Sequence, residues 1–130
     1  MRRCSILIVE DEAPLLRALE RRFRQLGCEI DIAIDGEMAM KKLRTATYTM
    51  VILDLLLPKK HGLTVLKELR AYPRTAKVPV IVLTNYADDN TIRQTEKLGA
   101  IDYLLKVEHP IDSIVERVGE IIKKIVKKKR

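Results

Sequence analysis

Aromatic residues are scarce in this chain of 130 residues, which contains no Trp, one Phe and four Tyr. Hydrophobic residues nevertheless make up 47% of the sequence, so the core must be aliphatic and built from Ile, Leu and Val. A chain of this length can bury about two-thirds of its unfolded surface in a single core. We therefore expect one domain that spans residues 1–130.

Long apolar runs are also lacking. No run approaches the roughly 20 residues needed to cross a bilayer, which argues against a membrane-spanning protein. The N-terminal apolar stretch Cys4–Val9 stops at Glu10 without a small-residue cleavage site, so no secretory signal peptide is expected. The sequence thus predicts a cytoplasmic protein with no membrane partner.

Cysteine occurs only as Cys4 and Cys28, with no CxxC motif and no His at ligand spacing. Each of the two begins an apolar, strand-like run, so the thiols can lie close together if those strands are neighbours. A cytosolic compartment would keep them reduced. We interpret both as small, buried apolar residues.

Positive charge is concentrated at one end of the chain. The net charge of +7 suggests nucleic-acid binding, but six of the 25 basic residues lie at the C-terminus, and the other 19 nearly balance the 18 acidic ones. Residues 123–130 fit the basic, solvated end of a last helix, where cations complement the helix dipole. No spare recognition helix supports direct nucleic-acid binding. The six residues are Lys123, Lys124, Lys127, Lys128, Lys129 and Arg130.

Five apolar strand-like runs alternate with five helical patterns along the chain. The run Glu29–Ile34 alternates apolar and polar residues, as in a half-covered edge strand, whereas Met50–Leu53 is continuously apolar, as in a central strand. The alternation predicts an α/β fold, a flavodoxin-like, doubly wound, five-stranded parallel sheet with strand order 2-1-3-4-5 and five helices. The other strands are expected at Cys4–Val9, Val78–Leu83 and Ile101–Leu105, with helices beginning near Ala13, Gly36 and Gly62 and covering 88–98 and 111–127.

Chemically active side chains follow these strands. The carboxyl ends of parallel strands meet at one edge of the sheet, where ligands bind, so this edge should gather three carboxylates, one hydroxyl and one ammonium. Three adjacent carboxylates repel one another, and Mg²⁺, which prefers oxygen ligands, would remove that conflict. The residues are Glu10 and Asp11 after the first strand, Asp54 after the third, Thr84 after the fourth and Lys106 after the fifth.

This set suits phosphoryl transfer. Asp54 can attack phosphorus to give an aspartyl phosphate, Lys106 can neutralise the charge of the transferred group, and Thr84 can donate a hydrogen bond to it. Taken singly, each residue has an ordinary alternative: acids near position 10 favour the positive end of the next helix, Thr84 can end a strand, and Lys106 can be a solvated lysine. The joint placement of all five favours a phosphoacceptor site.

Four segments carry a family resemblance. In this order and spacing the chain resembles the receiver domain of two-component response regulators over nearly its whole length. The resemblance implies Asp54 as phosphoacceptor, Asp11 and Asp54 as direct Mg²⁺ ligands, Glu10 acting largely through a metal-bound water, and the backbone carbonyl of Leu56 as a further ligand. The segments are Val9-Glu10-Asp11, Asp54-Leu55-Leu56-Leu57-Pro58 with Gly62 four residues later, Leu83-Thr84, and Tyr103-Leu104-Leu105-Lys106.

The same resemblance implies partners and a switch. The phosphodonor would be a sensor histidine kinase or a phosphotransfer protein, and the domain, which is not a classical enzyme, would promote its own phosphorylation and dephosphorylation. Tyr103 would move inward when the Thr84 hydroxyl turns toward the phosphoryl group, a two-state element biased by a new dianion; an amphipathic tyrosine at a sheet edge is the alternative. A downstream protein would bind the face formed by the fourth helix, fifth strand and fifth helix, and phosphorylation would favour a homodimer.

The chain departs from the family pattern at three places. Val107 follows Lys106 where the family usually has proline, often with a cis peptide bond, and a cis bond before a residue other than proline costs about 2.5–4 kcal/mol. Asn85 stands where the family favours a very small residue. Leu56 and Tyr86 are bulky at positions that influence water entry in the family, which predicts a long-lived phosphoryl group.

Other functions on similar folds fit less well. The main alternative is a receiver-like adaptor that is not phosphorylated. A haloacid-dehalogenase-type phosphatase would place a second Asp where Leu56 stands, a P-loop NTPase would need GxxxxGK[ST], and a flavodoxin would need a Ser/Thr/Gly-rich loop where acids follow the first strand. We expect a stand-alone single-domain regulator or a piece of a longer one.

Overall fold

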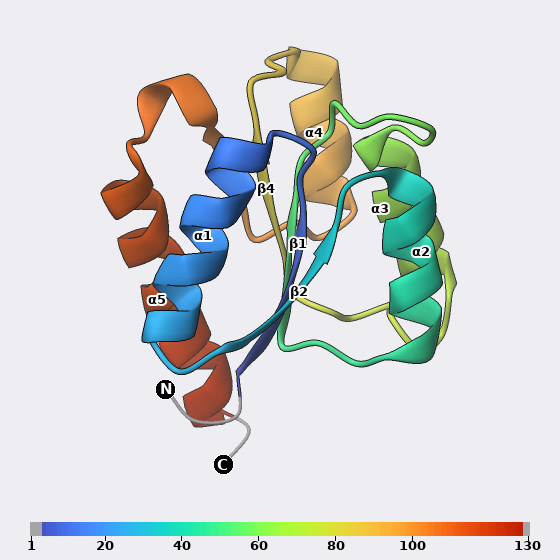
Figure 1. The fold of residues 1–130 in the computed structure, drawn as a ribbon. Coiled ribbons are helices and arrows are strands. Elements are labelled where there is room, and N and C mark those ends of the chain that lie inside the picture. Colours follow the sequence, from blue (N-terminus) through green and yellow to red (C-terminus); the bar gives the residue numbers. More distant parts are fainter. Residues whose placement is uncertain (1–3, 129–130) are drawn as a thin grey trace.

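The computed structural model describes residues 4–128 and shows a five-stranded parallel sheet in the order β2-β1-β3-β4-β5 (Figure 1). This is the predicted α/β fold and strand order. The strands are β1 (Ser5–Val9), β2 (Glu29–Ala33), β3 (Met50–Leu53), β4 (Val80–Thr84) and β5 (Asp102–Leu105). The helices are α1 (Ala13–Gln25), α2 (Gly36–Thr45), α3 (Gly62–Ala71), α4 (Asp89–Lys97), the short 3₁₀ turn η1 (Lys106–Glu108) and α5 (Ile111–Lys128).

The sheet separates two aliphatic cores. Figure 1 shows α1 and α5 on one face of the sheet and α2, α3 and α4 on the other. Alternate residues of β1 pack on opposite faces of the sheet. Ile6 and Ile8 pack with α1 and α5, whereas Leu7 and Val9 pack with α2 and α3. The side chains of β3 and β4 are buried throughout, as expected for strands covered on both sides.

The two edge strands carry acidic side chains held by cations from helices. On β2, Asp31 accepts hydrogen bonds from Lys42 Nζ at 2.6 Å and from the Tyr48 hydroxyl at 2.7 Å. On β5, Asp102 accepts one from Arg117 Nε at 2.8 Å. The predicted edge position of β2 is confirmed, and its middle residues are only partly buried.

Local signals set the helix boundaries. Asp35 caps α2 by accepting from the backbone N–H of Met38 at 2.8 Å, and Asp88 caps α4 by accepting from that of Thr91 at 3.0 Å. Gly27, at φ 90°, adopts the left-handed conformation that lets the chain turn after α1 into β2.

Details of α4 and of the strand limits differ from the sequence-based prediction. The buried positions of α4 are Thr91 and Thr95, whose hydroxyls bond to Asp88 and to the carbonyl of Ile92. Threonines therefore form the buried side of this helix, where the sequence pattern contained few apolar residues. Ile101 lies outside β5 and is 46% exposed. The expected basic end reaches residues outside those described, which include Lys129 and Arg130; Lys123, Lys124 and Lys127 are exposed.

Within residues 4–128, no helix is both long and apolar enough to span a membrane.

Candidate functional site

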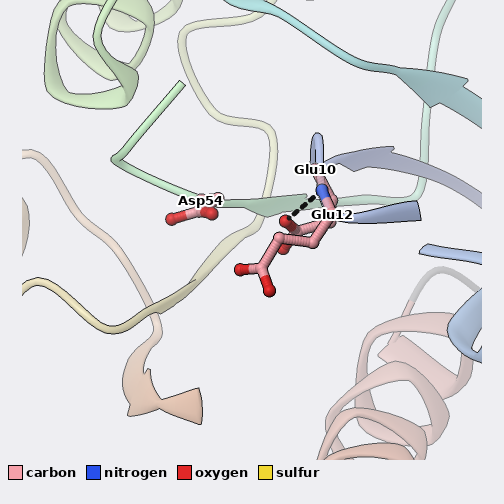
Figure 2. Close-up of side chains that lie close together, drawn as sticks. All are labelled: Glu10, Glu12 and Asp54. Atoms are coloured by element: carbon pink, nitrogen blue, oxygen red, sulfur yellow. Dashed lines mark hydrogen bonds between the residues drawn. The ribbon is translucent and has the colours of Figure 1, made fainter. Parts of the chain in front are cut away.

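The ends of three strands bring Glu10, Asp54 and Lys106 together. Glu10 directly follows β1, where its backbone N–H bonds to the Ala33 carbonyl at 3.0 Å. Asp54 directly follows β3, and its N–H bonds to the Val9 carbonyl at 3.0 Å. These two bonds extend the hydrogen-bond pattern of the sheet by one residue beyond each strand. Both carboxylates therefore lie at the same edge of the sheet (Figure 2).

Lys106, the first residue after β5, is the centre of this cluster. Its Nζ lies 2.8 Å from Glu10 Oε1, 2.8 Å from Asp54 Oδ2 and 2.6 Å from Glu12 Oε1. The side chains of Glu10, Asp54 and Lys106 are 2%, 3% and 9% exposed, whereas that of Glu12 is 58% exposed. Three carboxylates thus share one buried ammonium, and the site keeps an excess of negative charge.

Burial and charge shift the protonation of this cluster. Burial raises the pKa of Glu10 most, the hydrogen bonds from Lys106 and from the Glu12 N–H lower it, and the negative charge of Asp54 raises it again, leaving a pKa of about 7. Burial alone would lower the pKa of Lys106, but its bonds to Asp54, Glu10 and Glu12 outweigh this and raise it. Lys106 therefore stays charged at neutral pH, while Glu10 takes up a proton as the pH falls through about 7.

We expect Glu10 to make the stability of the metal-free protein pH-dependent. Its carboxyl has a higher pKa in the folded chain, about 7, than the ordinary 4.5, so the folded state holds the proton more tightly between these values. The contribution of Glu10 to the free energy of unfolding is therefore largest below pH 4.5. It falls by about 3 kcal/mol as the pH rises through 7. Urea unfolding in a chelator at several pH values would measure it. Glu10→Gln should remove this pH-dependent decline, and an unchanged profile in that variant would contradict the assignment.

The carboxylate oxygens form a set that fits a hard divalent cation. One oxygen each from Glu10, Glu12 and Asp54 lies within 4.8 Å of the others (Figure 2), and an all-oxygen donor set of this kind suits Mg²⁺. Asp11, predicted as a direct ligand, is exposed and lies outside this group. Its role, and that of the Leu56 carbonyl, stay predictions.

The backbone on the other side of Asp54 is tightly packed. The Leu56 N–H donates to Asp54 Oδ1 at 3.1 Å, and the Gly62 N–H donates to the Leu55 carbonyl at 2.8 Å. A Cβ at position 62 would lie 2.2 Å from the Asp54 carbonyl oxygen. Only glycine therefore permits this approach, which explains why Gly62, part of the resembling segment after β3, stands at the start of α3.

Thr84 and Tyr103 are connected through Tyr86. Thr84 ends β4 and is fully buried, and its Oγ1 accepts from the Tyr86 N–H at 3.2 Å. The carbonyl of Tyr86 in turn accepts a hydrogen bond from the Tyr103 hydroxyl. A turn of the Thr84 hydroxyl toward Asp54 would break the first of these bonds, so the geometry links the two predicted switch residues by one intervening residue.

Two of the unusual residues noted in the sequence contact each other. The peptide bond before Val107 is trans, since residues 4–128 contain no cis peptide. The Val107 N–H, a donor that proline lacks, bonds to Asn85 Oδ1 at 3.0 Å. Asn85 therefore ties the loop after Thr84 to the turn that carries Lys106.

The sequence marked Asn85 as an unusual neighbour of Thr84 but did not predict its bond to Val107, and it did not indicate Glu12 as a site residue. Glu12 contacts Lys106, and its N–H bonds to Glu10 Oε2 at 3.0 Å. Its position two residues beyond Glu10 was the available signal. The contact of Asn85 with Val107 joins residues 22 positions apart and has no local signature.

A sequence profile of the response regulator receiver domain matches residues 6–118. The chain belongs to this family. Receiver domains are the phosphoacceptor switches of two-component systems rather than classical enzymes, and they usually bind Mg²⁺ at an acidic cluster. The membership predicted from the four sequence segments is thereby confirmed.

Curated relatives and solved structures agree with this assignment. Response regulator ArlR of Staphylococcus saprophyticus is 31% identical over 120 residues, 92% of this chain and 53% of ArlR. Transcriptional regulatory protein DltR of Streptococcus agalactiae is 35% identical over 101 residues, 78% of this chain and 44% of DltR. This receiver domain thus spans about half the length of these curated relatives.

Two solved structures have the same fold. The receiver domain of Francisella response regulator 1452 superposes with a TM-score of 0.80 at 28% identity, covering 93% of this chain and 98% of that one. A CheY-like receiver domain protein from Methanospirillum hungatei JF-1 reaches a TM-score of 0.86 at 22% identity, covering 96% and 98%. The second likeness concerns the fold alone.

Proposed function

We propose that this receiver domain takes a phosphoryl group on Asp54 from a sensor histidine kinase or a phosphotransfer protein, in a Mg²⁺-dependent reaction that the domain itself promotes. The observation that carries the proposal is the buried carboxylate of Asp54, 2.8 Å from the Lys106 ammonium and beside a second buried carboxylate, Glu10. A buried nucleophile next to a fixed cation, at a cluster that suits a divalent ion, has the parts that phosphoryl transfer needs.

Each residue has a defined task in this reaction. Asp11, Asp54 and the Leu56 carbonyl would hold Mg²⁺, Glu10 would act largely through a metal-bound water, and Glu12 is a further carboxylate within reach. The ion would offset the charge of the phosphoryl oxygens. Asp54 would attack phosphorus through one of its carboxylate oxygens while the P–N bond of the donor's phosphohistidine breaks and the imidazole leaves. Lys106 then pairs with the transferred group, and the Thr84 hydroxyl donates a hydrogen bond to a phosphoryl oxygen.

The change would reach the surface through Tyr86. When Thr84 turns toward the phosphoryl group, its oxygen leaves the Tyr86 N–H, and the loop that accepts the Tyr103 hydroxyl is free to shift. The new dianion supplies the free energy that biases this two-state element. The affected surface is the face of α4, β5 and α5, where we place the downstream protein target and a phosphorylation-dependent homodimer. We place the domain in the cytoplasm with these partners.

A phosphoryl-mimic experiment tests the proposal. Beryllofluoride with Mg²⁺ should bind one-to-one, shift the amide NMR signals of residues 84–86 and 103, and fail to bind when Mg²⁺ is omitted. Asp54→Asn should abolish the response. Absence of binding to the wild-type domain would instead favour the alternative, an adaptor that is not phosphorylated.

We also expect the phosphoryl group to be long-lived. Leu56 and Tyr86 stand two residues beyond Asp54 and Thr84 with bulky side chains that are 47% and 37% exposed, and neither side chain is acidic. Phosphate release after labelling with acetyl phosphate should take minutes or longer at room temperature and should be faster in Leu56→Ala and Tyr86→Ala. Release within seconds from the wild type would contradict this expectation.

A further inference from the structure

The two cysteines form a pair at the opposite end of the sheet from Asp54. Both immediately precede a strand, and the register pairs Ser5 with Glu29, so Cys4 stands opposite Cys28 on neighbouring parallel strands. The Glu29 N–H bonds to the Cys4 carbonyl at 2.8 Å and fixes this pairing. Paired residues of a parallel sheet point to the same face, and both side chains belong to the core between the sheet, α1 and α5.

The thiols are free, buried and in mutual contact. Their residues are 2% and 4% exposed. Burial, followed by the hydrogen bond and charge interaction with Cys28, raises the pKa of the Cys4 thiol to about 12. Neighbouring strands lie about 4.8 Å apart, which falls within the roughly 4.4–6.8 Å range of Cα separations that a disulfide accepts.

A surface pocket borders one member of the pair. It has a volume of about 420 Å³ and is lined by Cys4, Ser5, Gly27 and Glu29, and it is large enough for a small neutral oxidant to reach the Cys4 side of the pair. Gly27 lies directly before Cys28 in a left-handed turn, and neither cysteine lies inside a strand, so small adjustments of the backbone are available where the sulfurs must approach.

We propose that Cys4 and Cys28 are a redox-active pair that closes to an intramolecular disulfide when a hydroperoxide oxidises one of them. One thiolate attacks the peroxide oxygen, the O–O bond breaks, and an alcohol or water leaves with formation of a sulfenic acid. The second sulfur attacks the sulfenic sulfur, the S–O bond breaks, and water leaves. Two thiols and one hydroperoxide thus give one disulfide, one alcohol (or water) and one water.

This disulfide would link the start of β1 to the start of the edge strand β2 and enclose α1 in the closed loop. It would constrain the unfolded chain and so raise the thermal midpoint. The acidic site lies beyond the far end of β1, a five-residue strand that rises about 3.3 Å per residue. Oxidation should therefore leave binding of the phosphoryl mimic unchanged, which makes this input independent of the proposed phosphorylation.

Oxidation of the reduced chain with hydrogen peroxide at pH 8 tests the pair. Trypsin should release peptides 4–17 and 25–41 joined by a disulfide, the monomer should lose two titratable thiols, and its thermal midpoint should rise by about 5 °C or more. Dithiothreitol should reverse all three changes. The rate should increase with pH, because the thiolate is the reactive form.

The variants Cys4→Ser and Cys28→Ser are matched controls. Each should lose the joined peptides and the rise in thermal midpoint, and each should still bind beryllofluoride with Mg²⁺. The proposal is overturned if the wild-type peptides appear separately as sulfinic or sulfonic acids, if both thiols stay unmodified in millimolar peroxide, or if the disulfide joins two chains on a non-reducing gel. Each result is read on the wild-type protein, so it does not depend on how the variants fold.

Discussion

Replacing Lys106 with Met should lower the free energy of unfolding by about 3–5 kcal/mol at pH 8 in a metal-free buffer. The substitution keeps an unbranched apolar stem but removes the ammonium that Glu10, Glu12 and Asp54 share. Two buried carboxylates are then left next to each other without a compensating charge. Urea denaturation of the two proteins measures the difference.

Two features distinguish this effect from a general loss of packing. The loss should shrink toward pH 5, because protonation of the carboxylates removes their repulsion, and saturating Mg²⁺ should restore about 2–3 kcal/mol at a hundredfold excess over its dissociation constant. Lys60→Met is the matched control, since Lys60 pairs with Glu68 in a partly exposed ion pair worth about 1 kcal/mol or less. Equal losses in both variants, or a Lys106→Met loss that is independent of pH and Mg²⁺, would show that the shared ammonium is not what stabilises the site.

Asp54→Asn should eliminate phosphoryl uptake while the chain stays folded. The amide cannot form the acyl phosphate, so labelling by acetyl phosphate or by a histidine kinase should fall by about 10²-fold or more, to the limit of detection. Folding should survive because the substitution removes one of three clustered negative charges. Intact-protein mass spectrometry detects the added phosphoryl group, and circular dichroism monitors the fold.

Asp112→Asn provides the comparison for this experiment. Asp112 lies in the first turn of α5, and its side chain is 84% exposed in a surface ion pair with Arg22, so its loss should leave phosphoryl uptake unchanged. Full labelling of Asp54→Asn would show that another side chain is the phosphoacceptor. Glu10 and Asp11 would then be the next positions to replace.

The strand order was predictable because burial leaves a direct trace in the sequence. Met50–Leu53 is apolar at every position and occupies the centre of the sheet, whereas the alternation in 29–34 marks β2 as an edge. Helix α4 was harder to predict from apolar periodicity. Its buried positions are Thr91 and Thr95, which are polar residues whose hydroxyls form local hydrogen bonds.

The candidate site was predictable where strand ends determine position. Glu10, Asp54 and Lys106 directly follow β1, β3 and β5. The carboxyl ends of these parallel strands lie at one edge of the sheet, so the three side chains meet there. Asp11 and Glu12 lie beyond the strand, where the turn into α1 and side-chain length decide which carboxylate reaches inward. The structure places Glu12 against Lys106 and leaves Asp11 exposed, a choice that hydrophobic patterning does not encode.

The acids on the two outer strands have a consequence for self-association. Open sheets can recruit an extra strand from another molecule, and charged side chains on the rim discourage such growth. Asp31 and Asp102 place a charge on each rim, and Lys42 and Arg117 cover these positions from the adjoining helices. A second copy of the chain is therefore expected to contact the face of α4, β5 and α5 through side chains and not to add a strand to the sheet, which is protected against extension into fibrils.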